Sequence, residues 1–165
     1  MSDMRLPDDE VIKACAIGFL EDARRARGTC EGAAEDVQRL EALATLGAVK
    51  YRLTPGSPNV DTDKMEGIVA KLEERRQELL CTVGEYLDTY MAARVLCRPG
   101  DTARWACWLH HVEGLTWRQV GARVHYSEDW TRRALARTGY EELYVLMPER
   151  FRRIFPNAED WEDCR

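Results

Sequence analysis

Two helix starts lie close together in the C-terminal half of the chain, and they restrict the fold more than any other feature. Thr116 and Ser127 each carry a side-chain oxygen that can accept a hydrogen bond from a backbone N–H of a first helical turn. Both are therefore predicted N-caps, with room between them for only a short helix and a tight turn. The residues from Gly114 to Arg133 are predicted to form two helices joined by a turn.

The first of these helices has an apolar side, and the second has a basic face. Trp117, Val120 and Val124 recur at helical spacing, and Gly121 allows a close approach by the helix that crosses it. After Ser127, three arginines lie on or beside one exposed face: Arg132, Arg133 and Arg137. This order predicts a helix-turn-helix, the motif that places a recognition helix in the major groove of DNA.

The charge of the chain is unevenly distributed. The formal net charge is −5, but residues 98–153 hold 10 Lys and Arg against 7 Asp and Glu, a net of +3. Residues 1–97 hold 13 against 18, and residues 154–165 hold 1 against 4. The one basic segment therefore contains the predicted helix-turn-helix, as expected for a nucleic-acid binder.

The N-terminal part predicts two long helices. The pattern is helical from Asp8 to about Lys50, and we expect the helix to continue through Gly28 and Gly32. Residues 54–61 contain two prolines and a glycine and predict a loop. A long amphipathic helix then follows, with its apolar stripe at Met65, Ile68, Leu72, Leu79, Val83, Tyr86 and Tyr90.

The two long helices are predicted to form an antiparallel hairpin, because neither can bury its stripe alone. The hairpin leaves apolar surface, which can be covered by a second copy, giving a homodimer, or by the C-terminal domain. A second break at residues 98–101 precedes a helix, capped by Asp101 or Thr102, that supports the helix-turn-helix and stops at Gly114. We therefore predict an all-α chain with a hairpin at 1–97, a helix-turn-helix domain at 98–153 and an acidic tail at 154–165. Glu149 to Phe155 is expected to add one more turn or short helix before the acidic end of the chain.

Several segments resemble known DNA-binding families. Residues 108–117, continued by Val124-His125-Tyr126-Ser127, resemble region 4 of bacterial sigma-70 factors. The chain looks closer still to the phage-encoded RinA/ArpU-like transcriptional regulators, which are similar over most of its length. This likeness includes residues 40–45, 56–58, 71–73 and 144–149. It implies a phage or prophage protein, in the cytoplasm of a bacterial host, that binds DNA to control late or packaging genes.

The resemblance places the recognition helix at Ser127 to about Tyr140. Two departures stand out: Glu128 and Asp129 can accept from a cytosine amino group but repel the phosphate backbone, and Gly139 is expected to weaken the helix. Arg118 and Arg123 are predicted to contact phosphates. The predicted major-groove set is Ser127, Glu128, Trp130, Arg132, Arg133 and Arg137, a solvated arginine face being the alternative. Trp105, Trp108 and Trp117 are expected in the core, whereas Trp130 is open to a base or a partner protein.

Other chemistry has little support in the sequence. The six cysteines form no C-x-x-C pair and are expected to be reduced thiols, and Cys107 with His110 and His111 lacks the further ligands of a metal site. No nucleophile motif or glycine-rich phosphate loop is present. We therefore expect no enzymatic activity, metal or cofactor. The absence of a long apolar run or a secretory signal predicts a cytoplasmic protein without membrane contact.

Two alternatives to a DNA-binding regulator remain open. The net acidity and the Glu128-Asp129 pair suit a mobile-element protein-interaction module or inhibitor that occupies a host nucleic-acid-binding protein. A small-terminase-like DNA-packaging subunit also combines a helix-turn-helix with helical oligomerisation segments, and it predicts a ring. The expected partners are double-stranded DNA and a second copy of the chain, with host RNA polymerase or another host protein as further candidates.

Overall fold

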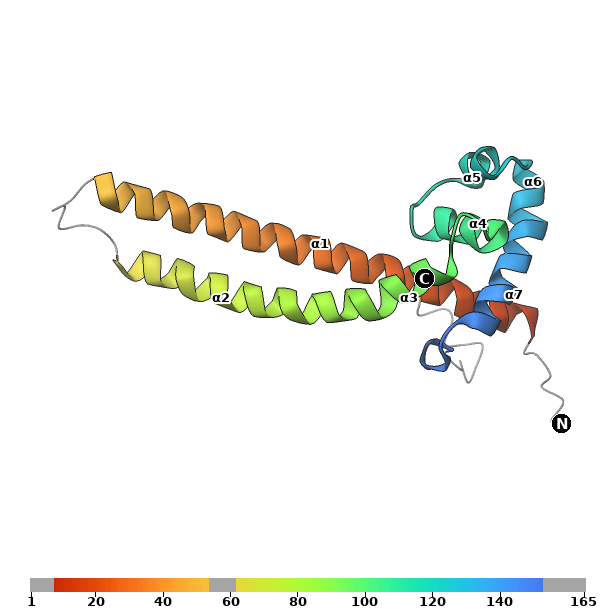
Figure 1. Cartoon of the computed structure of the whole chain (residues 1–165), viewed down its shortest axis with the longest axis horizontal. Helices are drawn as coiled ribbons and strands as arrows, with labels where there is room; N and C mark the ends of the chain where they lie inside the picture. Colours follow the sequence, from red (N-terminus) through yellow and green to blue (C-terminus); the bar gives the residue numbers. More distant parts are fainter. Residues whose placement is uncertain (1–7, 54–61, 153–165) are drawn as a thin grey trace. The chain divides into compact units, whose positions relative to one another are not determined.

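The structure, a computed structural model, describes residues 8–53 and 62–152, and all regular elements in these ranges are helical. The elements are α1 (Asp9–Leu53), α2 (Thr62–Glu85), the π-helical turn η1 (Tyr86–Tyr90), α3 (Met91–Leu96), α4 (Thr102–His111), α5 (Trp117–Val124), α6 (Glu128–Trp130), the π-helical turn η2 (Thr131–Leu135), α7 (Ala136–Leu146) and the 3₁₀ turn η3 (Glu149–Phe151) (Figure 1). The predicted all-α class is confirmed for the described ranges. The predicted loop at 54–61 and the acidic tail at 154–165 lie outside them.

The chain divides into two compact units, and the division falls inside α1. The first unit, called the core unit below, contains residues 8–24 and 89–152 of the described ranges. The second, called the paired-helix unit, contains residues 25–53 and 62–88. The domain boundary predicted from the sequence lies at 97/98, which places the first turns of α1 with the hairpin, and it stays a prediction.

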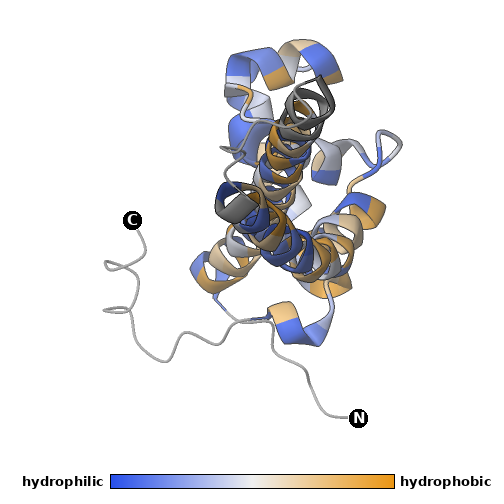
Figure 2. Ribbon diagram, turned by 90° about the vertical axis from the view of Figure 1, so that its left-hand side faces the viewer, coloured by the Kyte–Doolittle hydropathy of each residue, from blue (hydrophilic) through white to orange (hydrophobic). Residues whose placement is uncertain are grey.

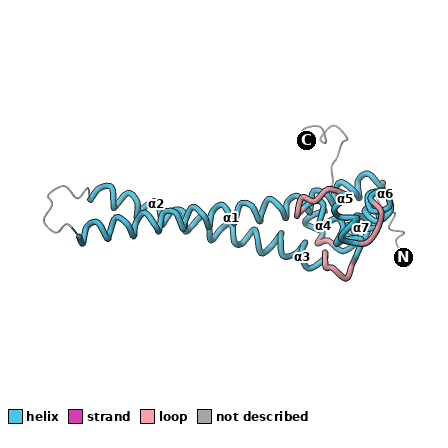
Figure 3. Tube along the Cα trace, turned by 90° about the horizontal axis from the view of Figure 1, so that it is seen from above, coloured by secondary structure: helices cyan, strands magenta, loops and turns pink. Residues whose placement is uncertain are grey.

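The paired-helix unit consists of the part of α1 beyond Arg24, α2 and the first three residues of η1. The two helices run antiparallel side by side (Figures 1 and 3), as the sequence predicts. Helix α1 also continues through Gly28 and Gly32 without a break, as expected. Val37 and Leu72 are buried, and Arg76 donates to Glu41 across the pair at 2.8 Å. Hydrophilic and hydrophobic residues both occur on these helices (Figure 2).

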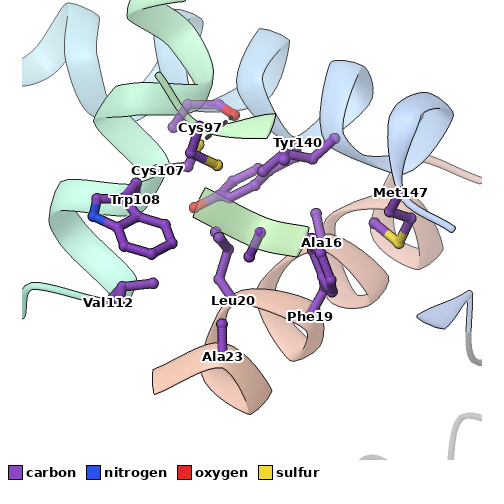
Figure 4. Close-up of a cluster of buried hydrophobic side chains, with 13 residues drawn as sticks. Ala16, Phe19, Leu20, Ala23, Cys97, Cys107, Trp108, Val112, Tyr140 and Met147 are labelled. Carbon is purple, nitrogen blue, oxygen red and sulfur yellow. Dashed lines mark hydrogen bonds between the residues drawn. The ribbon is translucent and has the colours of Figure 1, made fainter. Parts of the chain in front are cut away.

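The core unit has one main hydrophobic cluster, built by α1, α3, α4 and α7. Its largest buried side chains include Trp108, Phe19, Leu20, Leu143 and Met147, and Figure 4 shows several of them converging. The rings of Phe19 and Phe151 lie 4.9 Å apart between centroids. A smaller cluster of Ala106, Leu109 and Val120 joins α4 to α5. The first turns of α1 are therefore part of the same core as the C-terminal helices.

Gly139 marks the closest contact between α4 and α7. A Cβ at this position would stand 2.5 Å from the carbonyl oxygen of Ala103 and 2.6 Å from Sγ of Cys107. The expectation that Gly139 only weakens the helix is therefore incomplete, because α7 continues through it to Leu146. The absence of a side chain lets the two helices pack in contact, and that packing outweighs the intrinsic cost of glycine.

The described cysteines are not joined by any disulfide, and two of them, Cys97 and Cys107, belong to the main hydrophobic cluster. Burial raises the pKa of Cys97 to about 12, and it raises the pKa of Cys107 as well. Cys107 Sγ donates to the carbonyl of Ala136 at 3.6 Å. Both side chains are thus protonated, inert thiols at neutral pH. Within residues 8–53 and 62–152, no helix has an apolar stretch that would cross a bilayer.

Candidate nucleic-acid interface

Both predicted N-caps are confirmed. Thr116 Oγ1 accepts from the N–H of Gln119 at 3.4 Å, and Gln119 Oε1 accepts from the N–H of Thr116 at 2.9 Å, which completes a capping box at the start of α5. Ser127 Oγ accepts from the N–H of Trp130 at 3.3 Å. Between the caps, α5 ends at Val124, and its C-cap His125 adopts a left-handed conformation with φ 62°. Local residues therefore fix where each of the two helices begins.

Gly121 sets the distance between α5 and the helix that follows. A Cβ there would lie 2.8 Å from the carbonyl oxygen of Tyr126 and 3.3 Å from Oγ1 of Thr131. Thr131 is fully buried, and its hydroxyl donates to the carbonyl of Ser127 at 2.8 Å. The close approach expected at Gly121 is confirmed. It fixes which side of the second helix faces inward.

Helix α4 contacts the start of α5 and the residues just before it, through one polar contact and one ring-stacking contact. His110 Nδ1 lies 2.7 Å from the carbonyl oxygen of Leu115, and the His110 ring stacks on Trp117 at 3.9 Å between centroids. Asp101 stands at the N-cap position of α4, but its side chain makes no cap bond and instead pairs with Arg104 at 2.7 Å. Trp108 is buried and Trp105 and Trp117 are half-buried, which confirms their expected place at the core.

His111 links α4 to α7. Its Nε2 lies 2.9 Å from the hydroxyl of Tyr140. Burial, with a smaller contribution from the neighbouring His110, lowers the pKa of His111 to about 4. The imidazole is therefore neutral at neutral pH, and it braces the inner side of the second helix instead of adding charge to the surface.

The second helix runs without interruption from Glu128 to Leu146 as α6, η2 and α7. Its inner side is buried at Thr131, Ala136, Gly139, Tyr140 and Leu143. Its outer side carries the predicted groove residues, and Trp130 is 55% exposed. The π-helical turn η2 was not predicted, and it holds two of the candidate residues, Arg132 and Arg133. Such single π turns inside α-helices occur often at functional sites.

The three arginines of the second helix are exposed, as predicted, but each faces a carboxylate. Asp129 Oδ1 lies 2.9 Å from Nε of Arg133 and 3.7 Å from Nη2 of Arg132. Arg137 pairs with Glu141 at 3.0 Å and with Asp9 of α1 at 2.6 Å. The hydrogen bond to Glu141, followed by the charge of Asp9, raises the pKa of Arg137. The basic face predicted from sequence is therefore partly neutralised from within the chain.

The two arginines of α5 have a different environment. Arg118 and Arg123 are exposed, and neither makes an ion pair or side-chain hydrogen bond with any residue in 8–53 or 62–152. Ser127, Glu128 and Trp130 lie in the first turn of the second helix and are exposed as well. The fold thus brings the eight predicted site residues onto two consecutive helices, and among the described residues only the cations of the second helix have carboxylate partners.

Comparisons with protein families, with curated proteins and with solved structures found no match to this chain. Within the described ranges, no group of three or more His, Cys, Asp or Glu side chains is placed to hold a metal ion. The candidate site therefore depends on its own geometry: exposed cations and aromatics on two capped helices. This combination can bind a polyanion.

Proposed function

We propose that the chain is a DNA-binding transcriptional regulator of phage or prophage origin, with α5 and the helix from Glu128 acting as a helix-turn-helix. The observation that carries this proposal is the close crossing at Gly121 between two capped helices. That crossing leaves the outer side of the second helix exposed, as entry into a major groove requires. The resemblance to phage-encoded regulators supports the assignment to phage gene control.

The two helices would contribute different contacts. Arg118 and Arg123, which have no carboxylate partner in the described ranges, are suited to phosphate contacts that give affinity. Arg132 and Arg133 would contact the major groove of the DNA after giving up their ion pairs with Asp129. Exposed ion pairs of this kind contribute about 0–1 kcal/mol, so a charge-assisted bond to phosphate can replace them.

Self-association is part of the same proposal. In the paired-helix unit, large apolar side chains remain exposed at Leu43, Leu46, Val69, Leu80 and Leu87. A second copy of the chain would bury them and give a homodimer, which binds two half-sites. Sedimentation equilibrium of the full chain tests this part, because a monomer at all concentrations would remove it.

The main experiment measures binding of the full chain to duplex DNA from upstream of its own gene over a salt series, with random duplex as competitor. We expect log affinity to fall linearly with log salt, with a slope of about −0.9 per phosphate contact. Replacing both arginines by Arg118→Gln and Arg123→Gln should reduce the slope by about 2 and weaken binding to both duplexes alike.

The matched control is Arg39→Gln, which removes one exposed arginine of the paired-helix unit. This variant should bind DNA as the unaltered chain does. Absence of binding at low salt, or an affinity that ignores salt, would remove the proposed function. If the control loses as much DNA affinity as the α5 variant, the phosphate contacts assigned to Arg118 and Arg123 are wrong.

A second candidate function is a protein-interaction module that occupies a host nucleic-acid-binding protein. One observation favours it: Asp129 neutralises two arginines beside two exposed aromatic side chains, Tyr126 and Trp130. Exposed aromatics of this type are common anchors at protein interfaces. This candidate is favoured if the chain does not bind DNA but binds a host protein stoichiometrically. The substitution Trp130→Ala should then abolish binding of that host protein.

A further inference from the structure

A groove of about 220 Å³ lies in the core unit between the first turns of α1 and the second helix. In Figure 1 the start of α1, in red, lies beside α7, in blue. Four cationic side chains line the groove, namely Lys13, Arg132, Arg133 and Arg137. At about 30 Å³ per water molecule, its volume holds several waters and thus the oxygens of a phosphoryl group. The groove has no role in the predictions from sequence.

Arg137 is held in this groove by two carboxylates with different origins. Glu141, one turn further along α7, accepts from Nε at 3.0 Å and orients the guanidinium. Asp9, in the first turn of α1, accepts from Nη2 at 2.6 Å. Both side chains of the Arg137–Asp9 pair are 65% exposed. One edge of the guanidinium is therefore pre-oriented, while the other makes a short bond to an exchangeable acid.

We propose that this groove binds a phosphoryl group, and that Asp9 occupies its place on Arg137 while the site is unliganded. A carboxylate and a phosphate offer the same paired oxygens to a guanidinium, and both form short charge-assisted bonds with it. When Asp9 is displaced, Lys13 offers a second positive charge in the lining, and Arg132 and Arg133 add theirs if they also exchange Asp129 for the phosphoryl group. Glu141 keeps Arg137 in position throughout.

The phosphoryl group can belong to a DNA backbone or to a free phosphorylated ligand, because the recognition chemistry is the same. In its DNA form the inference rests on the function proposed above. DNA must then displace Asp9 from Arg137 before this arginine can contribute to binding. The free energy needed to break the ion pair is small, because exposed pairs of this kind contribute about 0–1 kcal/mol.

The test uses the full chain with the substitution Asp9→Asn, which keeps the shape of the side chain and removes its charge. Glu10→Gln is the matched control: Glu10 also lines the groove, but it makes no ion pair with Arg137. We expect Asp9→Asn to raise DNA affinity several-fold and to steepen the salt slope by about 0.9, because Arg137 is no longer paired with a carboxylate whose release offsets one phosphate contact. Glu10→Gln should change the affinity less and leave the slope unchanged. Adding Arg137→Gln should abolish the effect of Asp9→Asn.

A second measurement follows the Nε–H signal of Arg137 by NMR during titration with inorganic phosphate. A saturable shift that occurs at lower phosphate in Asp9→Asn supports the site. If that shift occurs and Asp9→Asn also steepens the DNA slope, the source is DNA. The shift without any DNA binding indicates a free phosphorylated ligand and removes only the proposed function.

The inference is overturned separately from the proposed function if the chain binds DNA, Asp9→Asn leaves the slope unchanged and phosphate does not shift the Arg137 signal. Absence of DNA binding together with an unmoved Arg137 signal overturns both. The substituted side chains are exposed, and far-UV circular dichroism of each variant confirms that it is folded.

Discussion

The core unit and the paired-helix unit hold their helices together by different means. In the core unit, Trp108, Phe19, Leu20, Leu109, Leu143 and Met147 are all less than 2% exposed. In the paired-helix unit, the buried side chains within the described part are Ala26, Val37 and Leu72, at 7–9% exposure. Burial of a large apolar side chain contributes about 1.5–3 kcal/mol, so most of this stabilisation lies in the core unit.

The core unit buries large apolar side chains by its own packing, whereas the described part of the paired-helix unit buries few. Two helices in contact along one narrow stripe bury little, and helix propensity alone rarely holds such a pair. The exposed leucines of the paired-helix unit are the surface that the proposed second copy of the chain would cover. The core unit already packs its apolar side chains from α1, α3, α4 and α7 into one cluster.

The strongest test compares the same substitution in both units. Leu143→Ala should lower the free energy of unfolding by about 2–5 kcal/mol, because it leaves a cavity in a packed core. Leu80→Ala, at a leucine that is 65% exposed, should change it by less than about 0.5 kcal/mol at low protein concentration. Urea unfolding measures both, with tryptophan fluorescence reporting on the core unit and circular dichroism on all helices.

Protein concentration separates two explanations of a larger effect at Leu80. If a second copy covers this residue, the cost of Leu80→Ala should rise with protein concentration, since association then adds to stability. Costs that are equal for both leucines and independent of concentration would contradict the contrast between the units.

The second prediction concerns pH and is confined to the core unit, which contains all three histidines. The pKa of His111 is about 4 in the folded chain against an ordinary 6.5, so between these values only the unfolded chain binds the proton. The stability from neutral His111 is therefore complete above pH 6.5 and is lost as the pH falls toward 4. The loss amounts to roughly 3 kcal/mol in all, at about 1.4 kcal/mol per unit.

His111→Gln should flatten this part of the pH profile, measured by urea unfolding followed by tryptophan fluorescence. His125→Gln is the control, because His125 is an exposed histidine at the end of α5. A profile that is equally steep with and without His111 would assign the pH dependence to other groups.

The third prediction uses glycines and expects opposite signs in the two units. Gly139→Ala should cost about 1–3 kcal/mol, because the added carbon would meet the backbone of Ala103. Gly28→Ala should gain about 0.5–1 kcal/mol, since nothing lies within 4 Å of a Cβ there and alanine favours the helix. Thermal unfolding measures both shifts. Stabilisation by Gly139→Ala would mean that α4 and α7 do not pack as closely as described.

Features that depend on near neighbours could be predicted from the sequence. The caps at Thr116 and Ser127, the close approach at Gly121 and the continuity of α1 follow from residues within a few positions of one another. The pairing of Arg133 with Asp129, and of Arg137 with Glu141, also has the four-residue spacing of helical ion pairs, so it could have been found.

Features that depend on distant residues could not be predicted in this way. Asp9 and Arg137 are 128 positions apart, and no periodicity links them. Phe19 and Leu20 fit an amphipathic helix equally well whether that helix packs on α2 or on α7. Gly139 looks unfavourable by helix propensity, and only its contact with α4 explains it. Tertiary packing decides each of these, and a single sequence does not contain it.

The smallest predicted effect concerns the ion pair between Glu41 and Arg76, which joins the two helices of the paired-helix unit at 2.8 Å. Both side chains are nearly half exposed, so a double-mutant cycle with Glu41→Gln and Arg76→Gln should give a coupling of about 0.2–1 kcal/mol. The coupling should fall as salt is added, because solvent ions screen exposed charges. Arg27 and Glu31, paired within α1, provide a reference coupling of about 0.3–0.5 kcal/mol.

A larger coupling that survives high salt would break the contrast drawn between the units. Such a value requires that solvent is excluded from Glu41 and Arg76, and in the single chain these side chains are 46% and 49% exposed. Only a further protein surface would exclude solvent from these two side chains. If the coupling also grows with protein concentration, that surface belongs to a second copy of the chain, and the paired-helix unit is completed by association, whereas the core unit is completed by its own packing.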